Sequence, residues 1–160
     1  MLHFQNDYSE GAHPRVLEAL QDVNKTPTTG YGQDEHCKAA ADRLKEIFAC
    51  PGADVHFLVR GPQTNLTAAA AFLRPWEAMI AADTGHVCVH ETGAIEATGH
   101  KVLPLADPEG KVRAEAVDAY VTAHWADPTH EHMVQPGMVY ISHPTEYGTL
   151  YTKAELEALS

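Results

Sequence analysis

Two polar residues, His86 and Glu91, follow an apolar segment that predicts a buried strand at residues 78–82. An imidazole just beyond the end of such a strand can stack on a flat heteroaromatic ligand, or it can take up and release protons near neutral pH. The competing interpretation is that His86 is a turn residue exposed to water, and that Glu91 is a solvated acid near the start of a helix.

A second candidate site lies where a strand predicted at residues 54–59 passes into an alanine-rich helix predicted at residues 64–74. The intervening turn and the first residues of the helix are Gly61, Pro62, Gln63, Thr64 and Asn65. The start of a helix presents unpaired N–H groups and a partial positive charge, and a glycine there lets a phosphate approach the backbone closely. This stretch is therefore a candidate phosphate-binding turn, although a glycine at a strand end is more often only a turn.

Helices and strands alternate along most of the chain. The predicted helices span 13–23, 34–52, 64–74, 90–97, 114–125 and 153–160, and the predicted strands span 54–59, 78–82, 100–105 and 137–142. This alternation predicts an α/β fold with a parallel-rich sheet between helical layers, in which a ligand binds beyond the carboxyl ends of the strands. No repeat or linker interrupts the pattern, so we expect a single domain over residues 1–160.

The composition narrows the class of partner. Acidic residues outnumber basic ones 22 to 11, which gives a net charge of −11 and argues against nucleic acid or an anionic membrane as a partner. No apolar run is long enough to span a bilayer and no leader segment opens the chain, so we expect a cytoplasmic protein. The three cysteines, Cys37, Cys50 and Cys88, show no metal-binding spacing and are expected to be reduced thiols.

The eleven histidines raise metal binding as an alternative function. The densest group is HWADPTHEH, with His124, His130, Glu131 and His132. A His-x-His pair in a strand would place both rings on one face, but this stretch reads as a loop and no third spaced ligand is nearby. We therefore expect no metal site.

Five separated segments point to a known family. They are FQNDYSEGAHPRVLEAL (4–20), TGYGQDE (29–35), GPQTNLTAAAA (61–71), AADTGHVCVHETGAIEATGHKV (81–102) and ISHPTEYGTLY (141–151). In this order they resemble the threonine aldolases, which are pyridoxal 5'-phosphate (PLP) enzymes of the aspartate-aminotransferase fold, grouped with the β-eliminating lyases. The resemblance implies the N-terminal part of a PLP-binding large domain. It also implies cleavage of a β-hydroxy amino acid such as threonine to glycine and an aldehyde, in a homodimer or homotetramer.

The resemblance also implies roles for individual residues. Gly61, Pro62, Gln63 and Asn65 fall on the family's phosphate-binding turn, where Pro62 replaces a threonine and so removes an N–H and a hydroxyl, and Arg60 replaces a small residue. His86 falls on the histidine that stacks on the cofactor ring near the substrate hydroxyl, and Glu91 on the glutamate that follows it; both are candidate catalytic residues. Asn6 falls near the substrate carboxylate, and Tyr31 falls where a neighbouring subunit reaches the site.

The family's cofactor is held by a lysine that lies later in the chain than any residue here. The six lysines present are Lys25, Lys38, Lys45, Lys101, Lys111 and Lys153, and none is in the expected position. We therefore expect the C-terminal half of the enzyme to be missing and the 160 residues alone to be inactive. Two alternatives stay open: a non-catalytic truncated remnant, or another PLP-dependent β-eliminating lyase or racemase on the same fold.

Overall fold

The computed structural model describes residue 6 and residues 8–160. The chain divides into two compact units, Met1–Phe57 and Leu58–Ser160. Each unit is described by itself below, and the expectation of one domain stays a prediction.

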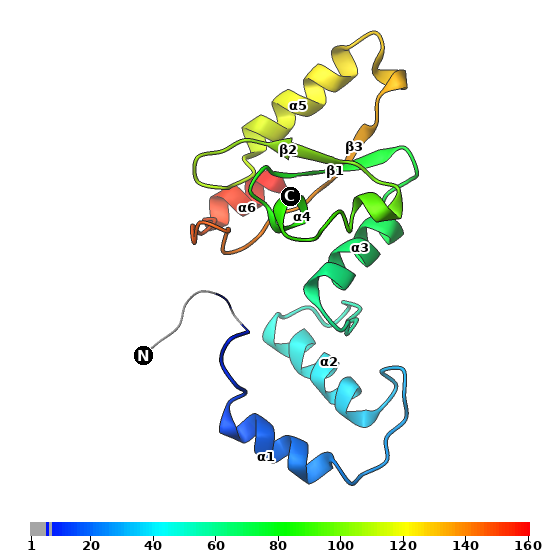
Figure 1. The fold of residues 1–160 in the computed structure, drawn as a ribbon, viewed down its shortest axis with the longest axis vertical. Helices are drawn as coiled ribbons and strands as arrows, with labels where there is room; N and C mark the ends of the chain where they lie inside the picture. The colour runs from blue at the N-terminus through cyan, green and yellow to red at the C-terminus, as the bar shows by residue number, and fades with distance from the viewer. Residues whose placement is uncertain (1–5, 7) are drawn as a thin grey trace. The chain divides into compact units, whose positions relative to one another are not determined.

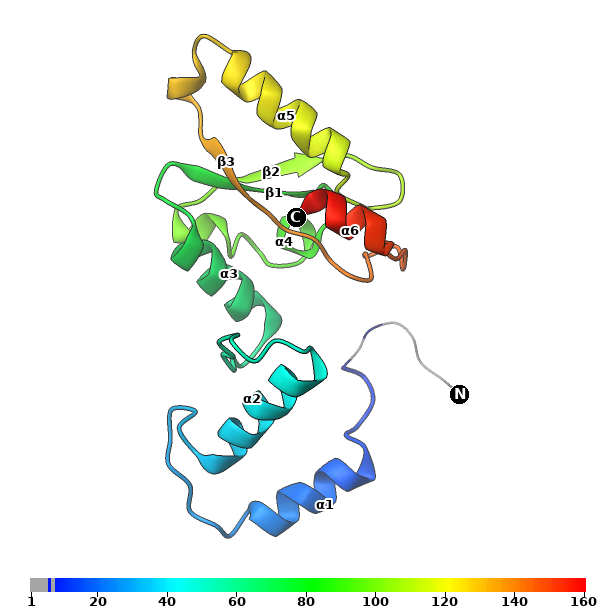
Figure 2. The ribbon, with the colours of Figure 1, turned by 180° about the vertical axis from the view of Figure 1, so that it is seen from behind.

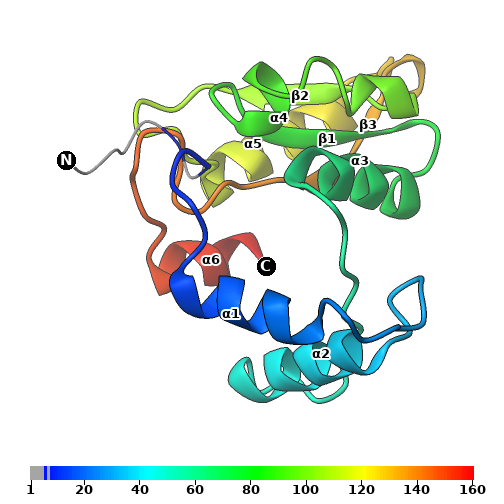
Figure 3. The same cartoon turned by 60° about the horizontal axis from the view of Figure 1, so that its bottom comes forward.

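The first unit contains two helices, α1 (Pro14–Val23) and α2 (Glu35–Ile47), joined by a loop (Figure 3). Pro14 occupies the first position of α1, where its missing N–H costs nothing. The carboxylate of Asp34 accepts the N–H of Cys37 at 2.9 Å and so caps α2. Both predicted helices are confirmed. Their apolar residues stay largely exposed, however: Leu20 of α1 is 57% exposed and Phe48, at the end of α2, is 69% exposed.

The strand predicted at residues 54–59 is wrong, because residues 53–58 have no regular secondary structure. A strand is held by hydrogen bonds to a neighbour, and within the described part of the chain this segment is not paired with any strand. Its apolar residues Phe57 and Leu58 are 49% and 40% exposed. The local sequence pattern was therefore insufficient to form a strand without a partner.

The second unit contains a sheet of three parallel strands in the order β2-β1-β3 (Figure 1). The strands are β1 (Glu77–Ala82), β2 (Val102–Leu105) and β3 (Gln135–Val139). Ile80 of β1 lies opposite Leu103 on one side and Val139 on the other. Because β1 is central and covered on both faces, it is apolar almost throughout. The predicted parallel sheet is confirmed, although β3 begins and ends earlier than the predicted 137–142.

Helices cover both faces of this sheet, so the unit has three layers (Figure 2). On one face α3 (Gly61–Phe72) and α4 (His86–Val89) pack against the sheet. Their core residues are Ala69, Leu73, Met79, Ala81, Val87, Ile95 and Val102. On the other face α5 (Ala114–Ala126) and α6 (Lys153–Leu159) cover a second core. Its buried residues are Ala78, Ile80, Ala82, Leu103 and Val112.

Three predicted helices differ from the structure. α2 ends at Ile47 rather than at residue 52. α3 begins at Gly61 rather than at residue 64, because Pro62 is compatible with a first helical turn. The helix predicted at residues 90–97 is wrong: α4 ends at Val89, and only a short 3-10 turn, η1 (Glu96–Thr98), follows. Thr92 and Gly93 have φ angles of 54° and 75°, which no continuous helix contains.

None of the helices in the described part of the chain has the length and apolar character that crossing a bilayer requires.

Candidate active site

The candidate site lies at the carboxyl ends of β1 and β3, the edge at which α/β proteins bind ligands. β1 ends at Ala82, a tight turn follows, and α4 begins at His86. The segment after β3 passes the same edge, and α3 presents Asn65 to it. The helices before and after β1 and the segment after β3 therefore meet at one place.

His86, Glu91 and Asn65 form a hydrogen-bonded chain. Nδ1 of the His86 ring lies 2.7 Å from Oε1 of Glu91, and Nδ2 of Asn65 donates to the same oxygen at 2.6 Å. The Glu91 side chain is fully buried, while the His86 side chain is 43% exposed. As a carboxylate, Glu91 accepts from both neighbours, so the neutral His86 ring carries its hydrogen on Nδ1 and leaves Nε2 as the acceptor. The two residues predicted to be catalytic are thus in contact.

The main chain of His86 has a second partner that sequence reasoning missed. Oε1 of Glu146 accepts the backbone N–H of His86 at 2.7 Å. The hydroxyl of Ser142 donates to the same oxygen at 2.6 Å. The available signal was an acid in the polar segment HPTEYGTLY, which directly follows a predicted strand.

Tyr140 completes the polar group next to these carboxylates. The phenol oxygen lies 3.4 Å from the hydroxyl oxygen of Ser142, whose own hydrogen goes to Glu146. Burial raises the pKa of the Tyr140 hydroxyl, and the nearby carboxylates of Glu91 and Glu146 raise it further. Tyr140 therefore stays neutral near pH 7 and keeps its hydrogen for donation.

The predicted phosphate-binding turn forms the first turn of α3. Within the described residues, the N–H groups of Gly61 and Gln63 donate to no protein acceptor, and Pro62 has no N–H. The Gln63 side chain accepts the N–H of Val59 at 3.1 Å, and the Thr64 hydroxyl donates to the carbonyl of Arg60 at 3.1 Å. The Thr64 hydroxyl and the Asn65 amide have partners within the protein, so the donors that this turn leaves for an anion are the backbone N–H groups and the amide nitrogen of Gln63.

Asn6 and Tyr31 belong to the first unit. The Asn6 side chain accepts the N–H of Tyr8 at 3.1 Å and the hydroxyl of Ser9 at 2.8 Å. Tyr31 is fully exposed and has a φ angle of 63°. Their roles at the substrate carboxylate and at a neighbouring subunit stay predictions.

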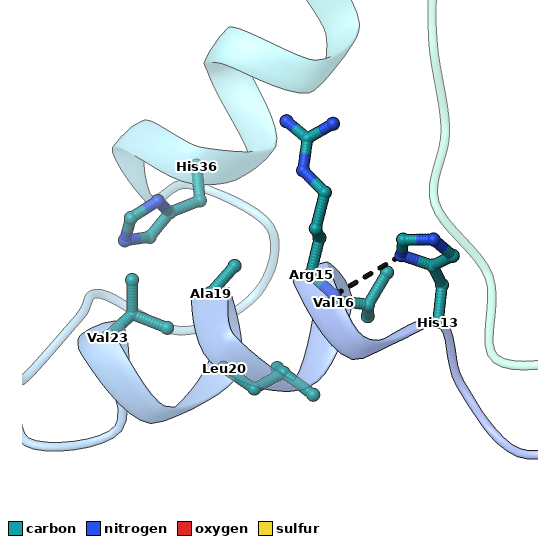
Figure 4. A pocket seen from close by; sticks show the side chains of 7 residues that line it. All are labelled: His13, Arg15, Val16, Ala19, Leu20, Val23 and His36. Atoms are coloured by element: carbon teal, nitrogen blue, oxygen red, sulfur yellow. Dashed lines mark hydrogen bonds between the residues drawn. The ribbon is translucent and has the colours of Figure 1, made fainter.

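A hollow of about 550 Å³ in the first unit is a poor candidate for a catalytic site (Figure 4). Its lining consists of His13, Arg15, Val16, Ala19, Leu20, Val23 and His36. The lining is mainly apolar, contains no carboxylate, and includes none of the predicted site residues.

The histidine-rich segment packs as an aromatic group. The rings of His124 and His130 lie 5.0 and 5.2 Å from that of Trp125 and 5.9 Å from each other. His130, Glu131 and His132 form a 3-10 turn, η2 (His130–His132), rather than a strand. Over residues 6 and 8–160, no three histidine, cysteine or acidic side chains come together as metal ligands.

All six lysines lie in the described residues, and three of them are paired with carboxylates. The pairs are Lys38–Asp42, Lys111–Glu155 and Lys153–Glu157. Within the described chain, no lysine is hydrogen-bonded to Asn65, His86, Glu91 or Glu146. The described site therefore contains a histidine and acids, but no amine.

Residues 12–160 match the beta-eliminating lyase family over nearly the whole chain, and the chain belongs to this family. A low specificity L-threonine aldolase of Pseudomonas aeruginosa is 28% identical over 159 residues, which are 98% of this chain and 44% of that protein. A second one, from a Pseudomonas species, is 27% identical over the same shares.

A solved structure of threonine aldolase from Leishmania major matches this fold with a TM-score of 0.90 at 51% sequence identity. The match covers 96% of this chain and 44% of that one. The chain thus spans less than half the length of the relatives it matches. These likenesses confirm the predicted resemblance to threonine aldolases and the predicted α/β fold.

Proposed function

We propose that this chain supplies part of the active site of a PLP-dependent carbon–carbon lyase, which cleaves a β-hydroxy amino acid such as threonine to glycine and an aldehyde. The observation that carries the proposal is the His86–Glu91–Asn65 chain at the carboxyl edge of a parallel sheet. Membership of the beta-eliminating lyase family and the similarity to proteins named threonine aldolases support it.

The described residues fit two parts of this cofactor, its phosphate group and its aromatic ring. Its phosphate is an anion, and the first turn of α3 offers the N–H groups of Gly61 and Gln63 with no acidic residue beside them. Its ring is flat and aromatic, and the His86 ring is 43% exposed, so part of it is accessible for stacking. Arg60 precedes Gly61 and adds a positive charge at this end of the helix.

When bound, PLP supplies an electron-withdrawing ring that weakens the Cα–Cβ bond of the amino acid. In the proposed reaction Nε2 of His86 takes the proton of the β-hydroxyl, directly or through one water molecule. Glu91 then faces the protonated ring at Nδ1 and stabilises its positive charge, while Asn65 holds the Glu91 carboxylate in place. Glu91 is buried and so acts through His86 rather than on the substrate.

The amine that anchors the cofactor is not supplied by the described site, and we propose that it comes from outside these 160 residues. We likewise propose an amino acid as the substrate, a homodimer or homotetramer as the assembly and the cytoplasm as the location.

The test is an assay of the complete gene product with PLP and threonine, in which glycine and acetaldehyde are both quantified. The proposal requires the two products in equal amounts, and a large fall in kcat for His86→Ala. Release of ammonia and a 2-oxo acid instead would assign β-elimination. Conversion to the D-amino acid would assign racemisation. Either result would refute carbon–carbon cleavage as the main reaction.

A further inference from the structure

His86 is held at two atoms by two carboxylates from different parts of the chain. Glu91, five residues further on, accepts from the ring at 2.7 Å. Glu146, sixty residues further on, accepts from the main-chain N–H at 2.7 Å. The first contact fixes where the ring carries its hydrogen, and the second fixes the backbone from which the ring projects.

The backbone at this position needs such support. α4 is only four residues long, and its preceding residue, Gly85, has no side chain with which to cap it. A helix of this length has little stability of its own. The carboxylate of Glu146 accepts one of the N–H groups that the first turn leaves free, in a charge-assisted hydrogen bond.

Glu146 is itself anchored. The hydroxyl of Ser142 donates to the same Oε1 at 2.6 Å, so this oxygen joins two donors. Ser142 follows β3, and His86 follows β1, which is the neighbour of β3 in the sheet. The contact therefore joins the segments that leave two adjacent strands at their carboxyl ends.

We propose that Glu146 is a positioning residue for His86, which holds the first turn of α4 so that the His86 ring keeps one orientation. This inference rests on the proposed function for its catalytic consequence, but not for its structural one. Glu146 is not in contact with the reacting atoms in this proposal, and it acts through the main chain of His86.

The structural consequence is measured by NMR on the complete gene product without added substrate. Four variants are compared with the wild type: Glu146→Ala, Glu146→Gln, Ser142→Ala and, as control, Glu131→Gln. Glu131 is an exposed acid in η2, so its variant matches the charge change of Glu146→Gln. The signals followed are the backbone amide of His86 and the ring nitrogens of His86.

A carboxylate acceptor moves an amide proton downfield and slows its exchange with solvent. In Glu146→Ala we expect the His86 amide signal to move upfield and its exchange to become faster by about tenfold or more. Glu146→Gln keeps an acceptor oxygen and should retain most of the protection. Ser142→Ala should give an intermediate change, and Glu131→Gln none.

An unchanged His86 amide in a folded Glu146→Ala protein overturns the proposal. If that variant does not fold, Ser142→Ala decides, and no change at His86 there overturns it as well.

The catalytic consequence is measured as kcat/KM for threonine and as the affinity for PLP. We expect Glu146→Ala to lower kcat/KM by about 10- to 100-fold through misplacement of the ring, with substantial rescue by Glu146→Gln. A loss that glutamine does not rescue, with normal His86 signals, would overturn a positioning role. If the wild type neither binds PLP nor cleaves threonine, the proposed function fails, whereas the NMR comparison still decides whether Glu146 holds His86.

Discussion

Asn65 and Glu91, which are 26 residues apart in the sequence, form a hydrogen bond of 2.6 Å between α3 and the segment that follows α4. The Glu91 side chain is fully buried, and the amide of Asn65 shares the oxygen that faces the His86 ring. A buried carboxylate is costly without donors, so this amide stabilises the charge on which the orientation of His86 depends.

Replacing Asn65 with alanine removes one of the two donors to this oxygen. We expect Asn65→Ala to lower the free energy of unfolding by about 1–3 kcal/mol, because a buried charged acceptor loses a partner. Urea denaturation measures the change. Asn24→Ala, at an exposed position after α1, serves as the control and should stay within about 0.5 kcal/mol of the wild type. An equal, small effect of both substitutions would contradict the structural role of Asn65.

Replacing Gly85 with alanine should disturb the turn that leads from β1 to His86. A Cβ atom at Gly85 would lie 2.9 Å from the carbonyl oxygen of Ala82, which is backbone and cannot move aside easily. We expect Gly85→Ala to cost about 1–3 kcal/mol of stability, measured by thermal unfolding. Gly52→Ala is the matched control, because a Cβ there meets nothing within 4 Å. A Gly85→Ala protein as stable as Gly52→Ala would show that this turn relaxes freely.

Glu155 makes stability depend on acid pH. The pKa of Glu155 is lowered from 4.5 to about 2 by three hydrogen bonds. The donors are the backbone N–H of Thr152, the Lys111 side chain and the Thr152 hydroxyl. Because the folded-state pKa is the lower one, this contribution is fully present above about pH 4.5 and is lost as the pH falls toward 2. Glu155→Gln should therefore be less stable than the wild type at neutral pH, and the difference should shrink in acid.

Chemical denaturation between pH 2 and 7 checks this prediction. Glu157→Gln is the control, since Glu157 pairs with Lys153 at an exposed position and should matter little at any pH. Parallel acid profiles for the wild type and Glu155→Gln would refute the assignment to Glu155.

The lysines of this chain should show no special reactivity toward PLP. We expect borohydride reduction of the 160-residue chain with PLP to give low labelling spread over several exposed lysines, measured by peptide mass spectrometry. Lys111 should be labelled least, because its side chain is 9% exposed and it pairs with Glu155 at 3.0 Å. Complete labelling of one lysine would instead place the anchoring amine inside this chain.

Local sequence patterns predicted elements whose packing partners are present in the same unit of the chain. β1 and α5 follow from apolar runs with strand and helix periods, and both pack within the second unit. The same reasoning failed at residues 54–59, since a strand depends on a neighbour that no local pattern specifies. It also failed at residues 90–97, where the positive φ angles of Thr92 and Gly93 end the helix early.

The candidate site could be predicted in part. An imidazole and a carboxylate placed just after a strand indicated ring stacking or proton transfer. The structure shows the side chains of His86 and Glu91 in contact. The partners across the sheet edge could not be found in the same way. Glu146 lies sixty residues from His86, and Asn65 uses its amide for Glu91, where the resemblance implied phosphate. These side-chain contacts depend on which strands are neighbours in the sheet, and a single sequence does not reveal the strand order.

The contrast between a buried Glu91 and a half-exposed His86 determines how hydrogen isotopes pass through this pair. Asn65 and the protein interior close off the carboxylate, so solvent reaches the pair only at the outer edge of the imidazole. In deuterated buffer the proton that Nε2 takes from the substrate can therefore exchange with deuterium at this edge before His86 passes a hydrogen on. Any hydrogen that His86 delivers to a product would bear the isotopic composition of the buffer, rather than that of the previous substrate.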